Sequence, residues 1–165
     1  MAITTAKSLA IYIIDRYKNM KSGEEISPIK LQKALYFCFA YWGGFVRKGK
    51  RLKSELSEIN VNDLEENLFD NKIEAWIYGP VIPEVYREFR DGTLENASSD
   101  DIFKGHFFEK SYIDGILDDV LRASDFSLVE ESHKDKCWKD NFDFKELMHS
   151  NEIPKEQIIN EYSYK

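Results

Sequence analysis

The stretch from Ala34 to Trp42 constrains the fold more than any other part of this sequence. Almost every residue in it is apolar or aromatic. A helix that is apolar on all sides cannot lie at a protein surface and is normally buried at the centre of its domain. We therefore expect a central helix here, around which the rest of the chain packs.

The start of this helix is marked clearly. Ser27 can accept the first free N–H groups, and Pro28 can follow as the first helical residue, where its missing N–H costs nothing. Ile26 and Leu31 occupy the two positions of a hydrophobic staple. The pair Gly43-Gly44 then offers a C-terminal stop, since glycine often follows the last helical turn.

Apolar residues at helical spacing predict further helices elsewhere, because three- and four-residue steps bring side chains to one face. We expect them over residues 5–20, 63–69, 83–91, 112–123, 127–133 and 154–162. Ser111 and Ser127 are the expected caps of the fourth and fifth of these helices.

Residues 73–78 follow a different pattern, because apolar residues alternate with others and so predict a short strand. A partner strand is available at 57–61, where Ile59 and Val61 alternate. Gly79-Pro80 should break the first strand. The predicted fold is mainly α, a compact single-domain helical bundle with a small β element.

The size and composition set wider limits. With 165 residues the chain is of ordinary size for one domain, which we expect to span residues 1–165. Its formal net charge of -7 argues against nucleic-acid binding, since phosphates would be repelled. Two cysteines do not form a disulfide framework. We find neither a signal peptide nor an apolar run of membrane-spanning length, so a cytoplasmic protein is expected.

One local run of charge opposes the acidic average. Arg47, Lys48, Lys50, Arg51 and Lys53 place five cations within seven residues. Such a run can steer an acidic partner or a phosphate. The interpretation that we favour is a solvated loop after the central helix.

No pattern of catalytic or metal-binding residues stands out. His133 and Cys137 are four residues apart and could share a helix face, either as two metal ligands or as a thiol–imidazole pair. Two ligands do not make a zinc site, and His106 and His149 lie far away in the sequence. We therefore predict no catalytic residue, no metal and no cofactor, and a binding protein instead of an enzyme.

Three blocks of sequence resemble a known family. They are Ser-Pro-Ile-Lys-Leu-Gln-Lys-Ala-Leu-Tyr-Phe at 27–37, Glu-Ala-Trp-Ile-Tyr-Gly-Pro-Val-Ile-Pro-Glu-Val-Tyr at 74–86, and Leu-Val-Glu-Glu-Ser-His at 128–133 with Trp138. These are similar to blocks of the Panacea domain, the family of SocA-like antitoxins and of GepA-like phage-associated proteins. The resemblance spans residues 5–138, and 139–165 would be a C-terminal helical extension.

The sequence also departs from that family. Cys137 stands where the family usually has proline before the tryptophan, and residues 53–72 make a longer and more acidic link. This link could be specific to one partner or be only a longer loop. Lys30, Gln32 and Lys33 are expected on the outer face of the central helix, to meet either the 78–81 turn or a partner.

The resemblance implies an antitoxin that neutralises a toxin, usually one encoded beside it, by direct protein contact. Some relatives instead act as adaptors that deliver the toxin to a host protease. The alternative is a phage or prophage accessory protein that binds a host defence or regulatory protein. The candidate partner-binding residues are Lys30, Lys33, Arg47, Lys48, Arg51, Trp76, Tyr78 and Tyr86, with specificity expected within 48–71.

Overall fold

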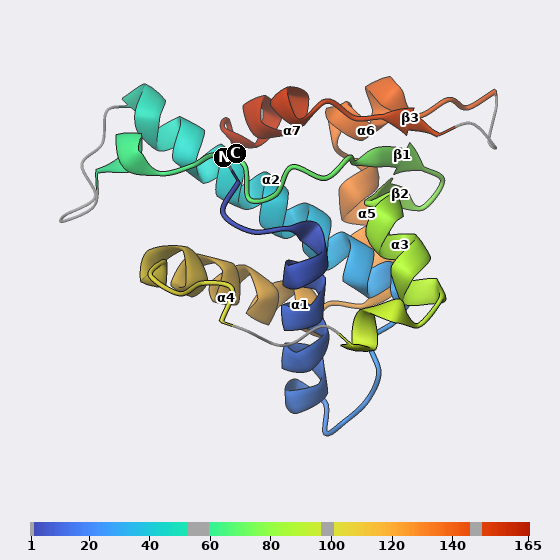
Figure 1. Cartoon of the computed structure of the whole chain (residues 1–165). Coiled ribbons are helices and arrows are strands. Elements are labelled where there is room, and N and C mark those ends of the chain that lie inside the picture. The colour runs from blue at the N-terminus through green and yellow to red at the C-terminus, as the bar shows by residue number, and fades with distance from the viewer. Residues whose placement is uncertain (1, 53–59, 97–100, 146–149) are drawn as a thin grey trace.

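A single long helix, α2 (Pro28–Leu52), runs through the middle of the molecule (Figure 1). This computed structural model describes residues 2–52, 60–96, 101–145 and 150–165. Around α2 pack α1 (Ala6–Met20), α3 (Pro83–Arg90), α4 (Phe107–Arg122), α5 (Asp125–His133) and α7 (Lys155–Tyr162). Two 3-10 helices, η1 (Val61–Asp63) and η2 (Thr93–Asn96), and a short helix, α6 (Lys136–Asn141), complete the helical part.

Burial on every side of α2 confirms the predicted central helix. Leu35, Tyr36, Phe37 and Cys38 point in four different directions around the axis, and none is more than 4% exposed. Because consecutive residues in a helix are turned by about 100°, only neighbours on all sides can bury them together. The prediction of a mainly helical, single-domain fold is confirmed as well.

The predicted end of α2 at Gly43-Gly44 is wrong, since the helix continues to Leu52. These glycines serve close packing. A Cβ on Gly43 would lie 2.7 Å from Ile159 Cγ1, and one on Gly44 would lie 2.6 Å from Tyr162 Cβ. The basic run 47–51 therefore lies in the last turns of α2 and not in a loop. Lys53 lies outside the described residues.

Most of the other predicted helices exist, with shifted starts. α1, α3 and α7 begin within a residue of their predicted positions, and Thr5 caps α1 by accepting from Ser8 N. α4 begins at Phe107 instead of 112, and α5 is capped by Ser124 instead of Ser127. The helix predicted at 63–69 is wrong, because η1 ends at Asp63 and residues 64–69 are not helical. α6 was not predicted.

The β element is a three-stranded antiparallel sheet in the order β2-β1-β3. Its strands are β1 (Glu74–Trp76), β2 (Gly79–Val81) and β3 (Asn151–Glu152). The strand predicted at 73–78 is confirmed as β1, but its partners are new. Residues 57–59 of the predicted partner lie outside the described residues, and Val61 belongs to η1.

Gly79-Pro80 also acts differently from the prediction. These residues do not end the β structure, because they form β2, with Trp76 facing Gly79 across a two-residue turn. β2 is an edge strand, the place in a sheet where a proline without an N–H is tolerated.

The segment 150–165 belongs to the same core. Ile158, Ile159 and Tyr162 of α7 are buried against α2. None of the helices in the described part combines the length and the apolar character needed to span a bilayer.

Candidate functional site

The three sequence blocks, 27–37, 74–86 and 128–133 with Trp138, meet at one place, which we call the junction. It consists of Gln32 and Lys33 from α2, residues 77–82 of the β1–β2 hairpin and its exit, and Ser132, His133 and Trp138 from α5 and α6. Helix α2 contacts both β2 and α5, so the central helix brings the hairpin and α5 together.

Lys33 lies at the centre of the junction. Its side chain is 1% exposed, and Nζ donates a hydrogen bond to the Pro80 carbonyl oxygen at 3.0 Å. Burial lowers the pKa of this ammonium to about 7, because removal from water disfavours the charged form. Near neutral pH the amine is therefore divided between its charged and neutral forms.

Gly79 is the backbone element against which Lys33 packs. Its φ of +107 is a conformation that side chains rarely allow. A Cβ here would overlap Ser132 Oγ and lie 2.8 Å from Lys33 Cε. Both the angle and the space therefore require glycine, which lets α2, β2 and α5 approach one another.

Gln32 fastens the next part of the hairpin. Its Oε1 accepts from Ile82 N at 2.8 Å, and its Nε2 donates to Ile82 O at 3.5 Å. Ile82 is the residue that precedes α3, and its carbonyl oxygen already accepts from Tyr86 N, so Gln32 supplies the partner that the Ile82 N–H would otherwise lack. Gln32 and Lys33 thus bind Ile82 and Pro80, the residues on either side of Val81, where β2 ends.

His133 and Trp138 close the junction from the other side. His133 Nε2 lies 2.9 Å from the Ile77 carbonyl oxygen, and its ring stacks on Trp138 at 4.2 Å. Trp138 Nε1 donates to Trp76 O at 2.8 Å. Partial burial lowers the pKa of His133, with a further contribution from the Lys33 charge. His133 thus binds the hairpin through one ring nitrogen and stacks on Trp138.

The eight candidate partner-binding residues fall into separate parts of the structure. Lys30 and Lys33 are not on an outer face, since only 8% and 1% of each is exposed. Trp76 packs against Tyr86 with ring centroids 4.9 Å apart, and Tyr78 at the hairpin tip is 59% exposed. Their role in binding a partner stays a prediction.

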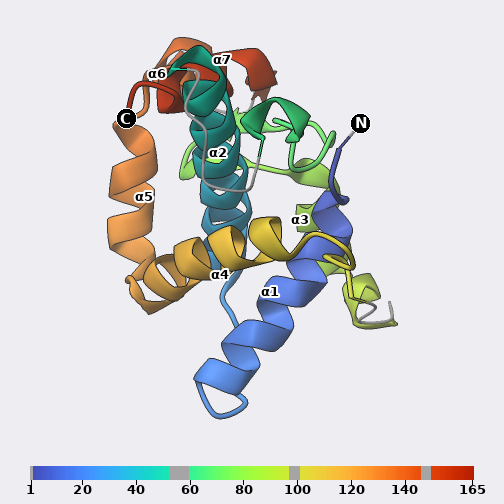
Figure 2. The same ribbon diagram turned by 90° about the vertical axis from the view of Figure 1, so that its left-hand side faces the viewer.

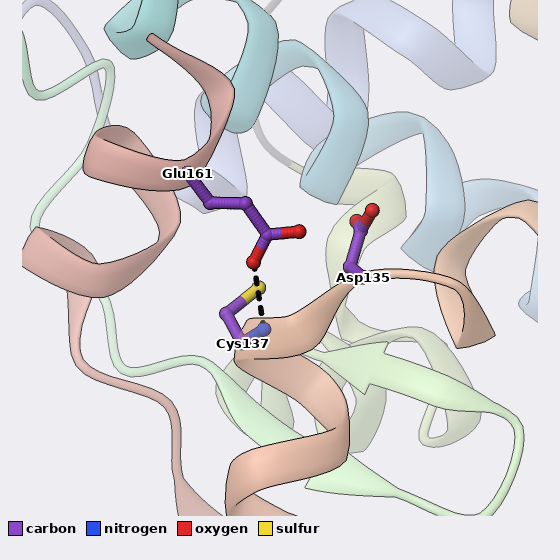
Figure 3. A group of neighbouring side chains, drawn as sticks. All are labelled: Asp135, Cys137 and Glu161. Carbon is purple, nitrogen blue, oxygen red and sulfur yellow. Dashed lines mark hydrogen bonds between the residues drawn. The ribbon is translucent and has the colours of Figure 1, made fainter. Parts of the chain in front are cut away.

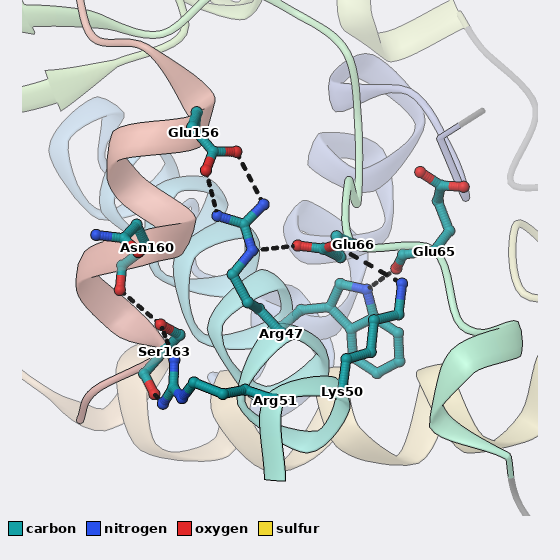
Figure 4. Close-up of polar contacts among 9 residues, drawn as sticks. Arg47, Lys50, Arg51, Glu65, Glu66, Glu156, Asn160 and Ser163 are labelled. Atoms are coloured by element: carbon teal, nitrogen blue, oxygen red, sulfur yellow. Dashed lines mark hydrogen bonds and ion pairs between the residues drawn. The ribbon is translucent and has the colours of Figure 1, made fainter. Parts of the chain in front are cut away.

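The basic end of α2 is largely engaged within the chain (Figure 4). Arg47 Nε donates to Glu66 at 2.7 Å, and its two terminal nitrogens bind Glu156 at 2.6 and 2.8 Å. Arg51 donates to Ser163 O at 2.6 Å, and Lys48 Nζ donates to Lys165 O at 3.1 Å. These cations tie α2 to the segment before β1 and to α7, which a solvated loop would not do.

Asp135, Cys137 and Glu161 form the group that most resembles a metal site among the described residues (Figure 3). Their ligand atoms lie within 4.8 Å of one another. Each is already engaged, however. Asp135 accepts from Tyr36 Oη and Tyr162 Oη at 2.5 Å and from Lys165 Nζ at 2.8 Å.

The other two members of this group act in the same way. Glu161 accepts from the backbone N–H groups of Lys136 and Cys137, at 3.0 and 2.7 Å, and so caps α6. Burial raises the pKa of Cys137 to about 12, so its thiol stays protonated at neutral pH. We interpret the group as a polar lock between α2, α6 and α7. The Cys137 thiol contacts Tyr36 Oη, and the His133 ring contacts the Ile77 carbonyl oxygen, so the two residues considered as a pair from the sequence have different partners.

A groove on another side of α2 was not predicted. It has a volume of about 430 Å³ and is lined by residues of α2, α4 and α5. Its lining is apolar or aromatic except for the carboxylates of Asp119 and Glu131. The sequence held a signal for it, since Tyr112, Ile116 and Ala123 recur at helical spacing beside the buried stripe of α4. The polar lock left no such signal, because Glu161 is distant in sequence from Asp135 and Cys137.

Comparison with known proteins gives one match. The family model described as "Antitoxin SocA-like, Panacea domain" matches residues 56–154, more than half of the chain. The match includes the second and third blocks and begins beyond the first. No curated protein and no solved structure matches this chain.

Proposed function

Because the chain belongs to the SocA-like antitoxin family of the Panacea domain, we propose that it neutralises a toxin in the cytoplasm by binding to it directly. The family match is the observation that carries this proposal. The toxin would be the product of a neighbouring gene, as the family resemblance implies.

The contacts of the reactive side chains support binding over catalysis. Lys33 is enclosed and bonded to Pro80, and the Cys137 thiol has its pKa raised to about 12 by burial. A catalytic thiol needs the opposite shift, towards the thiolate. Both side chains contact residues of this chain, Lys33 at the hairpin and Cys137 at Tyr36, which leaves the outer surface for a partner.

Co-expression tests the proposal. The product of the adjacent gene, expressed alone in a bacterial host, should arrest growth, and expression of this chain with it should restore growth. The two proteins should also co-purify at a constant ratio. A neighbouring product that is harmless alone, or that neither binds this chain nor is neutralised by it, would contradict the proposal.

The same strains separate two modes of neutralisation. After synthesis is stopped, a toxin held by direct inhibition keeps its level while growth continues. A toxin delivered to a host protease disappears faster when this chain is present, and its lifetime is restored in a protease-deficient host. We propose direct inhibition, so accelerated loss of the toxin would contradict that part.

A further inference from the structure

The groove between α2, α4 and α5 results from the way these three helices pack together. α4 crosses α2, the chain turns at 123–124, and α5 then runs beside α2 (Figure 2). All three helices contribute side chains to the lining of the groove. The volume of about 430 Å³ is within the range of roughly 300–1,000 Å³ that is typical of pockets that take ligands.

Helix α4 carries two apolar stripes, and only one of them is fully buried. Ile113, Leu117 and Leu121 are 0% exposed and pack in the core. Tyr112, Ile116 and Ala123 are only half-buried and line the groove. A half-exposed apolar stripe beside a fully buried one is the surface that a partner helix can cover.

Aromatic residues in the wall of the groove are held by contacts within the chain. Tyr41 of α2 is 41% exposed, and its ring packs edge-on against Tyr162 with centroids 4.9 Å apart. Tyr112 Oη donates to the Tyr41 carbonyl oxygen at 3.2 Å. Burial raises the pKa of Tyr112 to about 12, so this donor keeps its proton at any ordinary pH. A partner therefore meets a surface that needs little reordering, which favours affinity.

The charge at the groove indicates which partner would fit. Asp119 lines the groove, is exposed, and forms no ion pair with any residue in the described ranges. Glu131 lines the groove from α5, and its one ion pair within the described ranges is with the exposed Lys134, at 2.8 Å. An apolar floor between two carboxylates complements apolar side chains flanked by lysine or arginine.

We propose that this groove binds a basic amphipathic helix of the toxin, with apolar side chains over Ile116 and Tyr41 and cations facing Asp119 and Glu131. This inference rests on the proposed function for the identity of the partner. The shape and charge of the groove themselves do not depend on it.

A peptide experiment tests the groove apart from any toxin. The probe is a helical peptide of leucine and lysine, and its counterpart of leucine and glutamate is the charge control. The full chain should bind the first and not the second. Ile116→Asp should weaken binding at least ~10-fold, because it places a charge on the apolar floor. Asp119→Lys should weaken it by a similar factor through repulsion.

Matched variants keep this test specific. Phe126→Asp changes another apolar residue of α5 that is 71% exposed and is not part of the groove lining. Glu130→Lys makes the same charge change as Asp119→Lys, one residue away from Glu131. Both should bind the peptide as the parent chain does. Since Asp119 is exposed, Asp119→Lys remains informative even if Ile116→Asp lowers the melting temperature.

The outcomes separate the two proposals. Equal binding of both peptides would overturn the proposal that the groove binds a basic helix. Binding that Ile116→Asp and Asp119→Lys leave unchanged would overturn it as well. In the growth assay, loss of rescue by Asp119→Lys with rescue kept by Glu130→Lys supports the groove as the toxin site, and rescue kept by both overturns that role. If the parent chain binds the basic peptide through the groove but does not bind the neighbouring product, the groove stands and the antitoxin proposal fails.

Discussion

Lys33 is a charged side chain with almost no access to water. Its ammonium has one hydrogen-bond partner among the described residues, the Pro80 carbonyl oxygen. A buried cation is destabilising unless it loses its proton, and the lowered pKa of about 7 reflects that cost. The stability of the fold should therefore depend on pH through this one residue.

We expect the protein to become more stable as pH rises from 7 to 8.5. In this window the folded state releases the Lys33 proton, whereas the unfolded state, with a pKa near 10.5, keeps it. The gain is on the order of 1–2 kcal/mol in the free energy of unfolding. Lys33→Met removes the titrating group, so the difference in stability between the two proteins should change with pH by that amount, as measured by urea unfolding.

Lys134→Met is the control for this comparison. Lys134 is exposed, and its contact with Glu131 raises its pKa, so it stays charged in both states over this window. This variant should keep the pH dependence of the parent chain. If Lys33→Met also kept it, the burial of the Lys33 charge would not be the cause.

Gly79 is the second residue on which the junction depends. Replacement by alanine meets two obstacles, a positive φ and the overlap with Ser132 and Lys33. We expect Gly79→Ala to destabilise the fold by roughly 2–4 kcal/mol, visible as a lower melting temperature. Gly92→Ala shares the positive φ but meets nothing within 4 Å, so it should cost no more than about 1–2 kcal/mol. Equal losses for the two variants would show that close packing at Gly79 is unimportant.

At the scale of elements, the contact between α2 and α7 decides how α2 continues past its glycines. Two consecutive glycines weaken an isolated helix by roughly 1 kcal/mol each relative to alanine. Here the glycines allow α7 to pack so close to α2 that a Cβ at either position would lie less than 3.0 Å from an atom of Ile159 or Tyr162. Arg47 and the Asp135 lock then hold α7 in place from both ends. The close packing of α7 against α2 therefore outweighs the low helix propensity of the two glycines.

This contact reverses the usual sign of a glycine-to-alanine change. Gly44→Ala should destabilise the protein by roughly 1–3 kcal/mol, because the new methyl group would meet the Tyr162 backbone at 2.6 Å. Gly115→Ala in α4 has nothing within 4 Å of the new Cβ and should stabilise by roughly 0.5–1 kcal/mol. Chemical denaturation measures both. A stabilised Gly44→Ala protein would mean that α7 does not pack closely against α2.

At the scale of the whole molecule, α2 links the junction with the groove. Lys33, Phe37 and Tyr41 follow one another at four-residue steps and so lie along one face of this helix. The first belongs to the junction and the other two to the groove. The blocks that mark the family thus position α2 and α5, and these helices carry the surface that we propose for the partner.

The net charge of -7 gives a prediction about association with the toxin. An acidic protein attracts a basic partner before contact, and salt screens this attraction. We expect the association rate to fall on the order of 10-fold between low and high salt, with a much smaller change in the dissociation rate. Surface plasmon resonance at several salt concentrations measures both rates. An association rate that is independent of salt would contradict a charge-steered encounter.

The sequence by itself determined the parts that depend on local pattern. Uninterrupted apolar character from Ala34 to Trp42 required a buried helix, and the start signal at Ser27-Pro28 placed its beginning within a residue. The alternation at 73–78 identified β1, and the second and third blocks identified the family. Each of these signals lies within a few consecutive residues, where spacing alone determines which side chains share a face.

The tertiary structure decided everything that depends on contacts between distant segments. It made Gly43-Gly44 a packing site instead of a stop, placed Lys30 and Lys33 inside, and turned Gly79-Pro80 into a strand. It also created the groove from three helices and the lock around Asp135. A residue's local preference is worth about 1 kcal/mol or less, and close packing against a distant element is worth several, so the element that packs against it determines its role.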